Sequence, residues 1–236
     1  IVTPTVTHYK LAKYFLDNKI HVLLEKPMTE TVAQAKKLNA IAKKNKCVLQ
    51  IGHLEQFNPA IRKLRKSTCK PQFIEVHRLC QFNPRANDVD VVLDLMIHDI
   101  DIVLSIVNKK IDSIEVSGKK ILTNLTDIAN VRIKFKDNIV ANLTASRISS
   151  KNERKMRIFS NNSYYSIDFI NNKLKKIHKD RRNSFKVTDF NFKKTDTLND
   201  EINNFINTCL GKEKSMTTGI SGLEALVVAK KISKGF

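Results

Sequence analysis

Residues 20–52, "IHVLLEKPMTETVAQAKKLNAIAKKNKCVLQIG", decide the fold class of this chain. Two short apolar runs, at 20–25 and 47–52, are typical of strands that are buried on both faces. Between them, residues 29–46 have an apolar side and a lysine-rich side at the spacing of an α-helix. This strand–helix–strand order predicts a parallel α/β sheet.

The pattern changes after residue 55, because later apolar residues alternate with polar ones, as in half-buried strands. Turn signals such as Lys136-Asp137-Asn138 separate short runs of this kind between residues 111 and 190. We predict a parallel sheet with helices in a domain at 1–55, and a mixed, mostly antiparallel β-sheet domain with helices at 56–236. The fold class is therefore α/β plus α+β. Helices are expected at 5–18, 29–46, 57–65, 91–107, 198–210 and 220–233, and strands at 20–25, 47–52 and 73–82.

The chain is strongly basic, with 42 Lys and Arg against 23 Asp and Glu and a net charge of +19. Its Lys and Arg residues are scattered, and Asn and Ile are abundant too, which is what the codon bias of an AT-rich genome produces. An anionic partner is the alternative explanation. Nucleic-acid binding is disfavoured, because no helix-turn-helix, zinc finger or aromatic stacking surface is visible.

The four cysteines show no CxxC pair, which argues against a zinc finger and against a secreted disulfide scaffold. Reduced thiols in the cytoplasm are the simpler interpretation. No apolar run approaches the roughly 18 residues of a membrane helix, and no secretory signal is visible. The first methionine is Met28, so a sequence starting at Ile1 reads as a fragment, a processed chain or a product of unusual initiation.

Residues 91–104, "VVLDLMIHDIDIVL", place four ionisable groups in a segment that looks buried. On a helix, a polar stripe formed by Asp94, His98, Asp101 and Ser105 lies beside an apolar one. Asp94 and His98 lie one turn apart on it. An Asp can hold a neighbouring imidazole in one tautomer, and such a His can take a proton from an alcohol. Two alternatives stay open: a stripe that faces water, and a metal site formed with His53 or His77.

Lys26 follows the expected strand at 20–25, and in an open parallel sheet ligands bind beyond the carboxyl ends of the strands. An ammonium group at that place can orient a hydroxyl group and lower the pKa of the proton that it loses. The alternative is an ordinary lysine facing solvent at the end of a strand.

Three segments together resemble the Gfo/Idh/MocA family of NAD(P)-dependent sugar oxidoreductases: "TPTVTH" at 3–8, "IHVLLEKPMTETVAQAKKL" at 20–38 and "DLMIHDIDIVL" at 94–104. The resemblance implies that Lys26 touches both the nicotinamide and the substrate. It also implies that Asp94 and His98 bind the substrate and act as its acid/base pair. The residues expected to border NAD or NADP are Thr3, Pro4, His8, Glu25 and Lys26.

The implied reaction removes a proton from a sugar hydroxyl through His98, while hydride leaves the same carbon for the nicotinamide. Within the family, "IGHLEQFNPAIRKL" at 51–64 looks most like enzymes that oxidise nucleotide sugars. The resemblance further implies that the β-sheet domain makes substrate contacts and contacts between subunits of a homo-oligomer.

The chain departs from the family pattern in its glycines, because none of its six forms the GxGxxG loop that binds pyrophosphate. Asp90 and Gln56 also replace a frequent Gly and a frequent Arg. The resemblance implies that residues 1–55 are the C-terminal part of a Rossmann-like dinucleotide-binding domain, with an incomplete Rossmann-type parallel sheet. The sequence is therefore expected to be a fragment without the GxGxxG half, whose binding of NAD or NADP alone is doubtful. The alternatives are a catalytically inactive remnant that retains self-association, and a basic nucleic-acid-binding protein.

Overall fold

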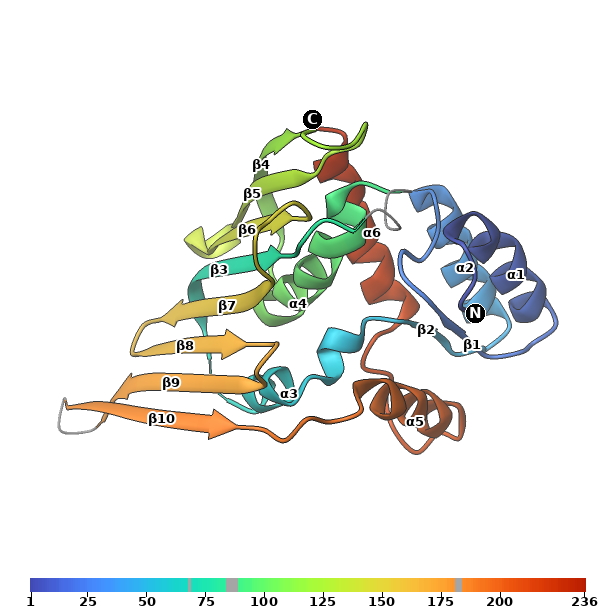
Figure 1. Cartoon of the computed structure of the whole chain (residues 1–236). Helices are drawn as coiled ribbons and strands as arrows, with labels where there is room; N and C mark the ends of the chain where they lie inside the picture. The colour runs from blue at the N-terminus through green and yellow to red at the C-terminus, as the bar shows by residue number, and fades with distance from the viewer. Residues whose placement is uncertain (68, 84–88, 181–183) are drawn as a thin grey trace. The chain divides into compact units, whose positions relative to one another are not determined.

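A computed structural model describes residues 1–67, 69–83, 89–180 and 184–236 (Figure 1). The chain forms two compact units, and each is built from two stretches of sequence. The first unit contains residues 1–57 and 196–230, and the second contains residues 58–195 and 231–236. Within the described residues, no helix is both long and apolar enough to cross a membrane.

The first unit holds a two-stranded parallel sheet in which Val22 of β1 is paired with Leu49 of β2. Thr31 begins α2, because its hydroxyl accepts the Gln34 N–H while the Gln34 side chain accepts the Thr31 N–H. The elements of this unit are α1 (Thr5–Asp17), β1 (Val22–Leu24), α2 (Val32–Lys44), β2 (Leu49–Ile51), η1 (Leu54–Phe57), α5 (Thr197–Cys209) and most of α6 (Gly219–Ser233).

The second unit is built on an eight-stranded sheet with the order β10-β9-β8-β7-β3-β6-β5-β4. Its neighbouring strands are antiparallel except β3 and β6, which are parallel. The strands are β3 (Pro71–Leu79), β4 (Ile111–Lys119), β5 (Ile128–Phe135), β6 (Val140–Ser146), β7 (Glu153–Ser160), β8 (Ser163–Asp168), β9 (Lys173–Lys179) and β10 (Phe185–Asn191). Its helices are α3 (Pro59–Arg65), η2 (Val92–Met96), α4 (Ile97–Val107) and η3 (Lys136–Asn138).

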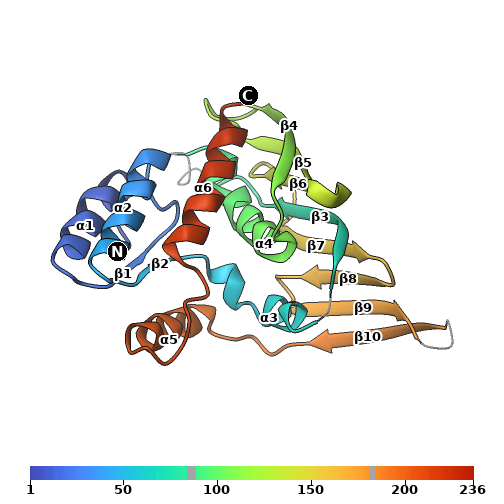
Figure 2. The same ribbon diagram turned by 180° about the vertical axis from the view of Figure 1, so that it is seen from behind.

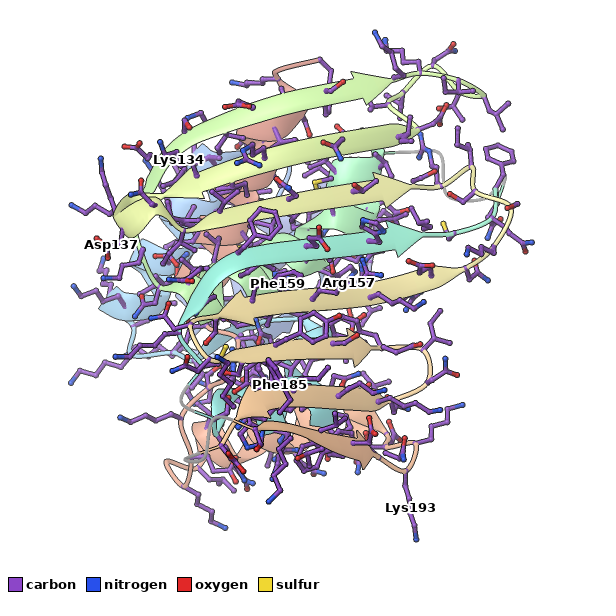
Figure 3. The ribbon with its side chains drawn as sticks, turned by 90° about the vertical axis from the view of Figure 1, so that its left-hand side faces the viewer. Lys134, Asp137, Arg157, Phe159, Phe185 and Lys193 are labelled. Carbon is purple, nitrogen blue, oxygen red and sulfur yellow. The ribbon has the colours of Figure 1, made fainter. Side chains whose placement is uncertain are left out.

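One face of this large sheet carries the core of the second unit, with α3 and α4 on the same side (Figures 1 and 2). Strand β5 shows why, because Ala129, Val131 and Ile133 are fully buried while the residues between them point the other way. The opposite face is open and lined with polar and aromatic side chains (Figure 3).

The predicted fold class is confirmed, since a small parallel sheet is followed by a large, mostly antiparallel one. The helix expected at 91–107 begins as a π-helix, η2, and continues as α4. The domain boundary expected near residue 55 stays a prediction. The segment 196–230, which contains α5, packs with the first unit.

Candidate active site

The Glu25-Lys26-Pro27 segment follows the carboxyl end of β1, and hydrogen bonds of its backbone N–H groups fix its conformation. The Glu25 N–H donates to the Ile1 carbonyl at 3.0 Å, and the Lys26 N–H donates to Oε2 of Glu25, also at 3.0 Å. The Lys26-Pro27 peptide bond is cis, and Lys26 is half-buried. Lys26 therefore stands at the strand end where open α/β sheets bind their ligands.

His8 joins the start of α1 to the same segment. Its Nδ1 lies 3.0 Å from the Pro27 carbonyl and its Nε2 lies 2.8 Å from the Thr3 carbonyl. Because a neutral imidazole carries a single N–H, neutral His8 donates to one of these carbonyls only. His8 is 1% exposed, whereas Thr3 and Pro4 are exposed. His8 thus fixes the backbone, and Thr3 and Pro4 are the accessible residues of this group.

Asp94 and His98 lie in the second unit, on the consecutive helices η2 and α4. Asp90 caps this helical segment, because its Oδ1 accepts hydrogen bonds from the N–H groups of Val92 at 3.0 Å and Leu93 at 2.9 Å. Both Asp94 and His98 are half-buried. A π-helical turn is rare and is often found at functional sites, so the place of Asp94 within one is notable.

The remaining acids of the segment are buried. Asp99 is 2% exposed and makes a two-pronged ion pair with Arg78 of β3, with both N–O distances at 2.8 Å. Asp101 is 3% exposed. Burial lowers the pKa of the Arg65 guanidinium, and the negative charge of Asp101 partly offsets this fall. The polar stripe therefore does not simply face water; of the four positions on it, only Ser105 is exposed.

A buried arginine holds the backbone just before η2. Nη1 of Arg147 donates to the Val89 carbonyl at 2.8 Å, while its Nε donates to Asp127 at 2.9 Å. Asp127 is fully buried, and hydrogen bonds from Thr123 and neighbouring backbone N–H groups hold the pKa of its carboxyl group well below its usual range, against the effect of burial. This charge pair anchors the chain that leads into the Asp94 helix.

The surroundings of Asp94 carry charges of both signs. Burial, and then the charge of Asp94, raise the pKa of the Cys80 thiol, while Arg154, Arg147 and Arg78 oppose that rise. Cys80 is therefore a protonated thiol at neutral pH. The carboxylate of Asp94 and three guanidinium groups therefore all act electrostatically on the same thiol.

The structure thus groups the predicted residues in two sets. Thr3, Pro4, His8, Glu25 and Lys26 lie around the end of β1 and the start of α1, in the first unit. Asp94 and His98 share one helical segment of the second unit, and their meeting with Lys26 stays a prediction. Among the described residues, no group of three or more His, Cys, Asp or Glu side chains is placed to hold a metal ion.

Sequence reasoning missed four of the buried charges that the structure describes: Arg78, Asp127, Arg147 and Glu201. For one of them a signal was available. Strand alternation puts Arg78 on the same face as Ile74 and Val76, which are buried, and a charge on a core face needs an acidic partner.

Comparison with known proteins defines the class first. Residues 1–53 match the "Oxidoreductase family, NAD-binding Rossmann fold", and residues 73–165 match the "GFO/IDH/MocA C-terminal domain". Levoglucosan dehydrogenase in complex with NADH and levoglucosan has the same fold, with a TM-score of 0.89 at 13% identity, covering 100% of this chain and 76% of that one.

Some enzymes are more similar to this chain in sequence than levoglucosan dehydrogenase is. The chain is 34% identical over 238 residues to UDP-N-acetylglucosamine 3-dehydrogenase of Acidithiobacillus ferrooxidans, which covers 98% of this chain and 76% of that protein. A solved structure of that enzyme gives a TM-score of 0.94 over 100% of this chain and 76% of the other. The scyllo-inositol 2-dehydrogenase (NAD(+)) of Bacillus subtilis is 27% identical over 165 residues, which is 63% of this chain and 48% of that protein. The chain therefore belongs to the Gfo/Idh/MocA family of oxidoreductases.

Proposed function

We propose that this chain carries the substrate site and nicotinamide-side residues of an NAD(P)-dependent dehydrogenase that oxidises a hydroxyl group of a nucleotide sugar. The observation that carries the proposal is its 34% identity, over 98% of its length, to an enzyme named UDP-N-acetylglucosamine 3-dehydrogenase. A UDP-linked N-acetylhexosamine is the substrate that this likeness favours. The net charge of +19 suits an anionic substrate of this kind.

In the proposed reaction His98 is the base that takes the proton from the sugar hydroxyl. Asp94, one turn earlier, binds the sugar and favours the protonated imidazole that forms. The ammonium group of Lys26 stabilises the negative charge that develops on the hydroxyl oxygen. The bound NAD or NADP supplies the hydride acceptor.

The residues present fit the nicotinamide end of such a cofactor. Lys26 is half-buried at a strand end, and Thr3 and Pro4 are exposed at the start of α1, which His8 ties to Pro27. A glycine loop of the GxGxxG type, which cradles pyrophosphate, is not among the 236 residues.

The lack of this loop gives a direct prediction for cofactor binding. We expect calorimetry at neutral pH to show no micromolar binding of NAD or NADP by the 236-residue chain, because the pyrophosphate lacks its backbone N–H donors. The control is the same titration in the presence of the N-terminal segment of the Acidithiobacillus enzyme that this chain does not cover. A submicromolar isotherm for the chain alone would contradict the prediction.

The substrate is tested by following reduced nicotinamide formed by the chain joined to that N-terminal segment. We expect UDP-N-acetylglucosamine to be oxidised with a higher kcat/KM than free N-acetylglucosamine, because the diphosphate adds charge-assisted contacts. The N-terminal segment on its own is the control for background activity. Equal rates with the two sugars, or no turnover of either, would count against the proposal.

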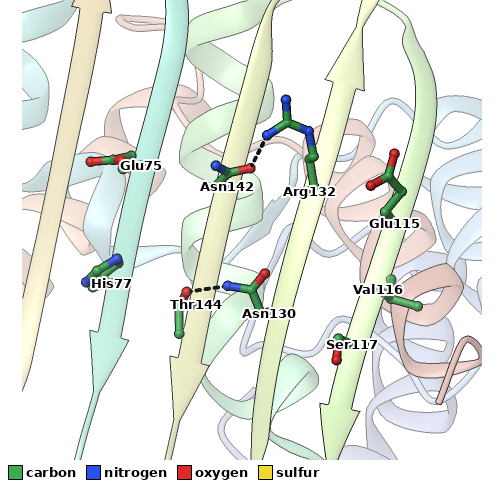
Figure 4. Close-up of a pocket in the computed structure, with 9 residues that line it drawn as sticks. All are labelled: Glu75, His77, Glu115, Val116, Ser117, Asn130, Arg132, Asn142 and Thr144. Carbon is green, nitrogen blue, oxygen red and sulfur yellow. Dashed lines mark hydrogen bonds between the residues drawn. The ribbon is translucent and has the colours of Figure 1, made fainter.

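We also propose that the chain self-associates through the open face of the large sheet. This face carries mixed charges and polar groups, with Arg132 donating to Asn142 at 3.2 Å and Asn130 to Thr144 at 2.8 Å (Figure 4). Phe159, which is 38% exposed, packs there against Phe73 and Tyr164. A surface with charges of both signs can pair with a copy of itself about a two-fold axis.

A further inference from the structure

Helix α5 has an unusual distribution of side chains, because a carboxyl group is buried on it while apolar residues are exposed. Glu201 is 1% exposed, whereas Leu198 is 51% and Ile202 is 40% exposed. Within the part of the chain that the structure describes, Oε1 of Glu201 is buried and has no hydrogen-bond partner. A buried ionised carboxylate without a partner is costly, so the protonation state of Glu201 needs an explanation.

The backbone of Glu201 is hydrogen-bonded to the side chain of Gln50, the middle residue of β2. Nε2 of Gln50 donates to the Glu201 carbonyl at 3.4 Å, and Oε1 of Gln50 accepts from the Ser215 hydroxyl at 2.9 Å. Gln50 is itself fully buried. The strand that leads to Gly52 and the helix turn that carries Glu201 are therefore joined by an amide in the core of the first unit.

Glu25, the residue before Lys26, lies directly against Gly52. A Cβ atom on Gly52 would come within 2.9 Å of both Cδ and Oε1 of Glu25. The Gly52 N–H also donates to the Leu24 carbonyl at 2.8 Å, so the ends of β1 and β2 are held together. The absence of a side chain at Gly52 thus leaves the space that the Glu25 carboxyl group occupies.

The carboxyl groups of Glu25 and Glu201 influence each other. Burial, and then the charge of Glu25, raise the pKa of Glu201 to about 7. The other ionisable groups on the neighbouring segments are Lys26, His53 and Glu55, together with Asp200 on α5 itself. Because two nearby carboxylates repel, the pair is more stable when it holds one proton than when it holds none.

We propose that Glu201 is a positioning residue: while its buried carboxyl group is protonated it does not repel the Glu25 carboxylate, which then keeps its place against Gly52. The Glu25 carboxylate in turn accepts the Lys26 N–H at 3.0 Å, so the proton on Glu201 fixes the backbone of Lys26. The role of Lys26 in turnover rests on the proposed function, but the effect of the Glu201 proton on Glu25 does not.

The direction of the pH effect follows from the raised pKa. The stability that Glu201 contributes is fully present below its ordinary value of 4.5 and is lost as the pH rises through about 7. In the same upper range the two carboxylates become charged together and repel. The Lys26 backbone should then become less well fixed.

Nuclear magnetic resonance on the full chain tests the pair without any need for activity. With ¹³C-labelled glutamate carboxyl groups, one signal should titrate near pH 7 and disappear in Glu201→Gln. The Lys26 amide signal should shift with the same midpoint in the wild type and stay constant in Glu201→Gln, whose amide keeps a neutral donor. Glu30→Gln, which removes an exposed carboxyl group of the same unit, should leave both titrations unchanged.

The inference is overturned if every glutamate signal of the folded chain titrates near the ordinary value of 4.5. It is also overturned if Glu201 titrates near pH 7 but the chemical shift of the Lys26 amide does not change over the same pH range. When the chain is joined to the N-terminal segment of the Acidithiobacillus enzyme, the loss of kcat above neutral pH should be smaller in Glu201→Gln than in the wild type. Intact titrations in a chain that never turns over a sugar would contradict the proposed function and leave the Glu25–Glu201 pair standing.

Discussion

Asp94 and His98 are more accessible to solvent than Asp99 and Asp101, the two other acidic residues of their helical segment. Asp99 is held by Arg78, and Asp101 acts on Arg65, while Asp94 and His98 stay half-buried. The sequence was enough to place Asp94 and His98 one turn apart on a helix. It was not enough to show that Asp99 and Asp101 are buried, because their partners come from distant segments that periodicity does not relate.

At the same scale, Lys26 gives a sharp test of the proposed chemistry. We expect Lys26→Ala, in the chain joined to the N-terminal segment of the Acidithiobacillus enzyme, to lower kcat by about 10²- to 10³-fold, because it removes the charge beside the developing alkoxide. Lys36→Ala, on α2, is the matched control and should leave kcat unchanged. Unaltered turnover in Lys26→Ala would assign Lys26 to the solvent-facing alternative.

At the scale of elements, strands and helices follow closely from hydrophobic period and turn residues. The capping box at Thr31 and the alternation of β5 are local signals, and local signals can be read from sequence. Strand order cannot be read in this way, since β3 lies between β6 and β7, far from its neighbours in sequence. Helix α5 also departs from the rule that the apolar side of a helix faces the core, because Leu198 and Ile202 are exposed while Glu201 is buried.

The ion pair between β3 and α4 predicts a large effect on stability. Both side chains are nearly inaccessible, at 4% for Arg78 and 2% for Asp99. We expect Arg78→Met to lower the free energy of unfolding by about 3–5 kcal/mol, because it leaves the Asp99 charge buried without this partner. Urea unfolding measures the change.

The control for this prediction is Lys13→Met, which breaks an exposed pair with Asp17 on α1. A surface pair of this kind contributes little to stability, so the urea midpoint of Lys13→Met should hardly move. A similar small change for Arg78→Met would show that the buried pair does not hold α4 on the sheet.

At the scale of the whole molecule, the chain combines a Rossmann-type unit with a sheet unit that has one open face (Figure 3). The two-part architecture was predictable, because apolar runs give way to alternating ones near residue 55. The return of residues 196–230 to the first unit was not, since nothing local in a helix specifies the unit that it packs against.

The open face predicts a change in oligomeric state on mutation. We expect sedimentation velocity to show a self-associated wild type and a smaller species for Phe159→Asp, because the new charge would be buried at the contact. Tyr14→Asp, at an exposed aromatic on α1, is the control and should sediment like the wild type. A monomeric wild type at micromolar concentration would contradict self-association through this face.

In the proposed reaction, His98 removes the proton from a nucleotide-sugar hydroxyl while hydride passes to the nicotinamide. The most direct test compares wild type and His98→Ala, each joined to the N-terminal segment of the Acidithiobacillus enzyme, by the rate of reduced nicotinamide formed from UDP-N-acetylglucosamine. We predict a fall in kcat of about 10²- to 10⁴-fold, the usual contribution of a positioned acid/base group. Turnover at the wild-type rate by His98→Ala would contradict the account and leave the Asp94–His98 pair without a catalytic role.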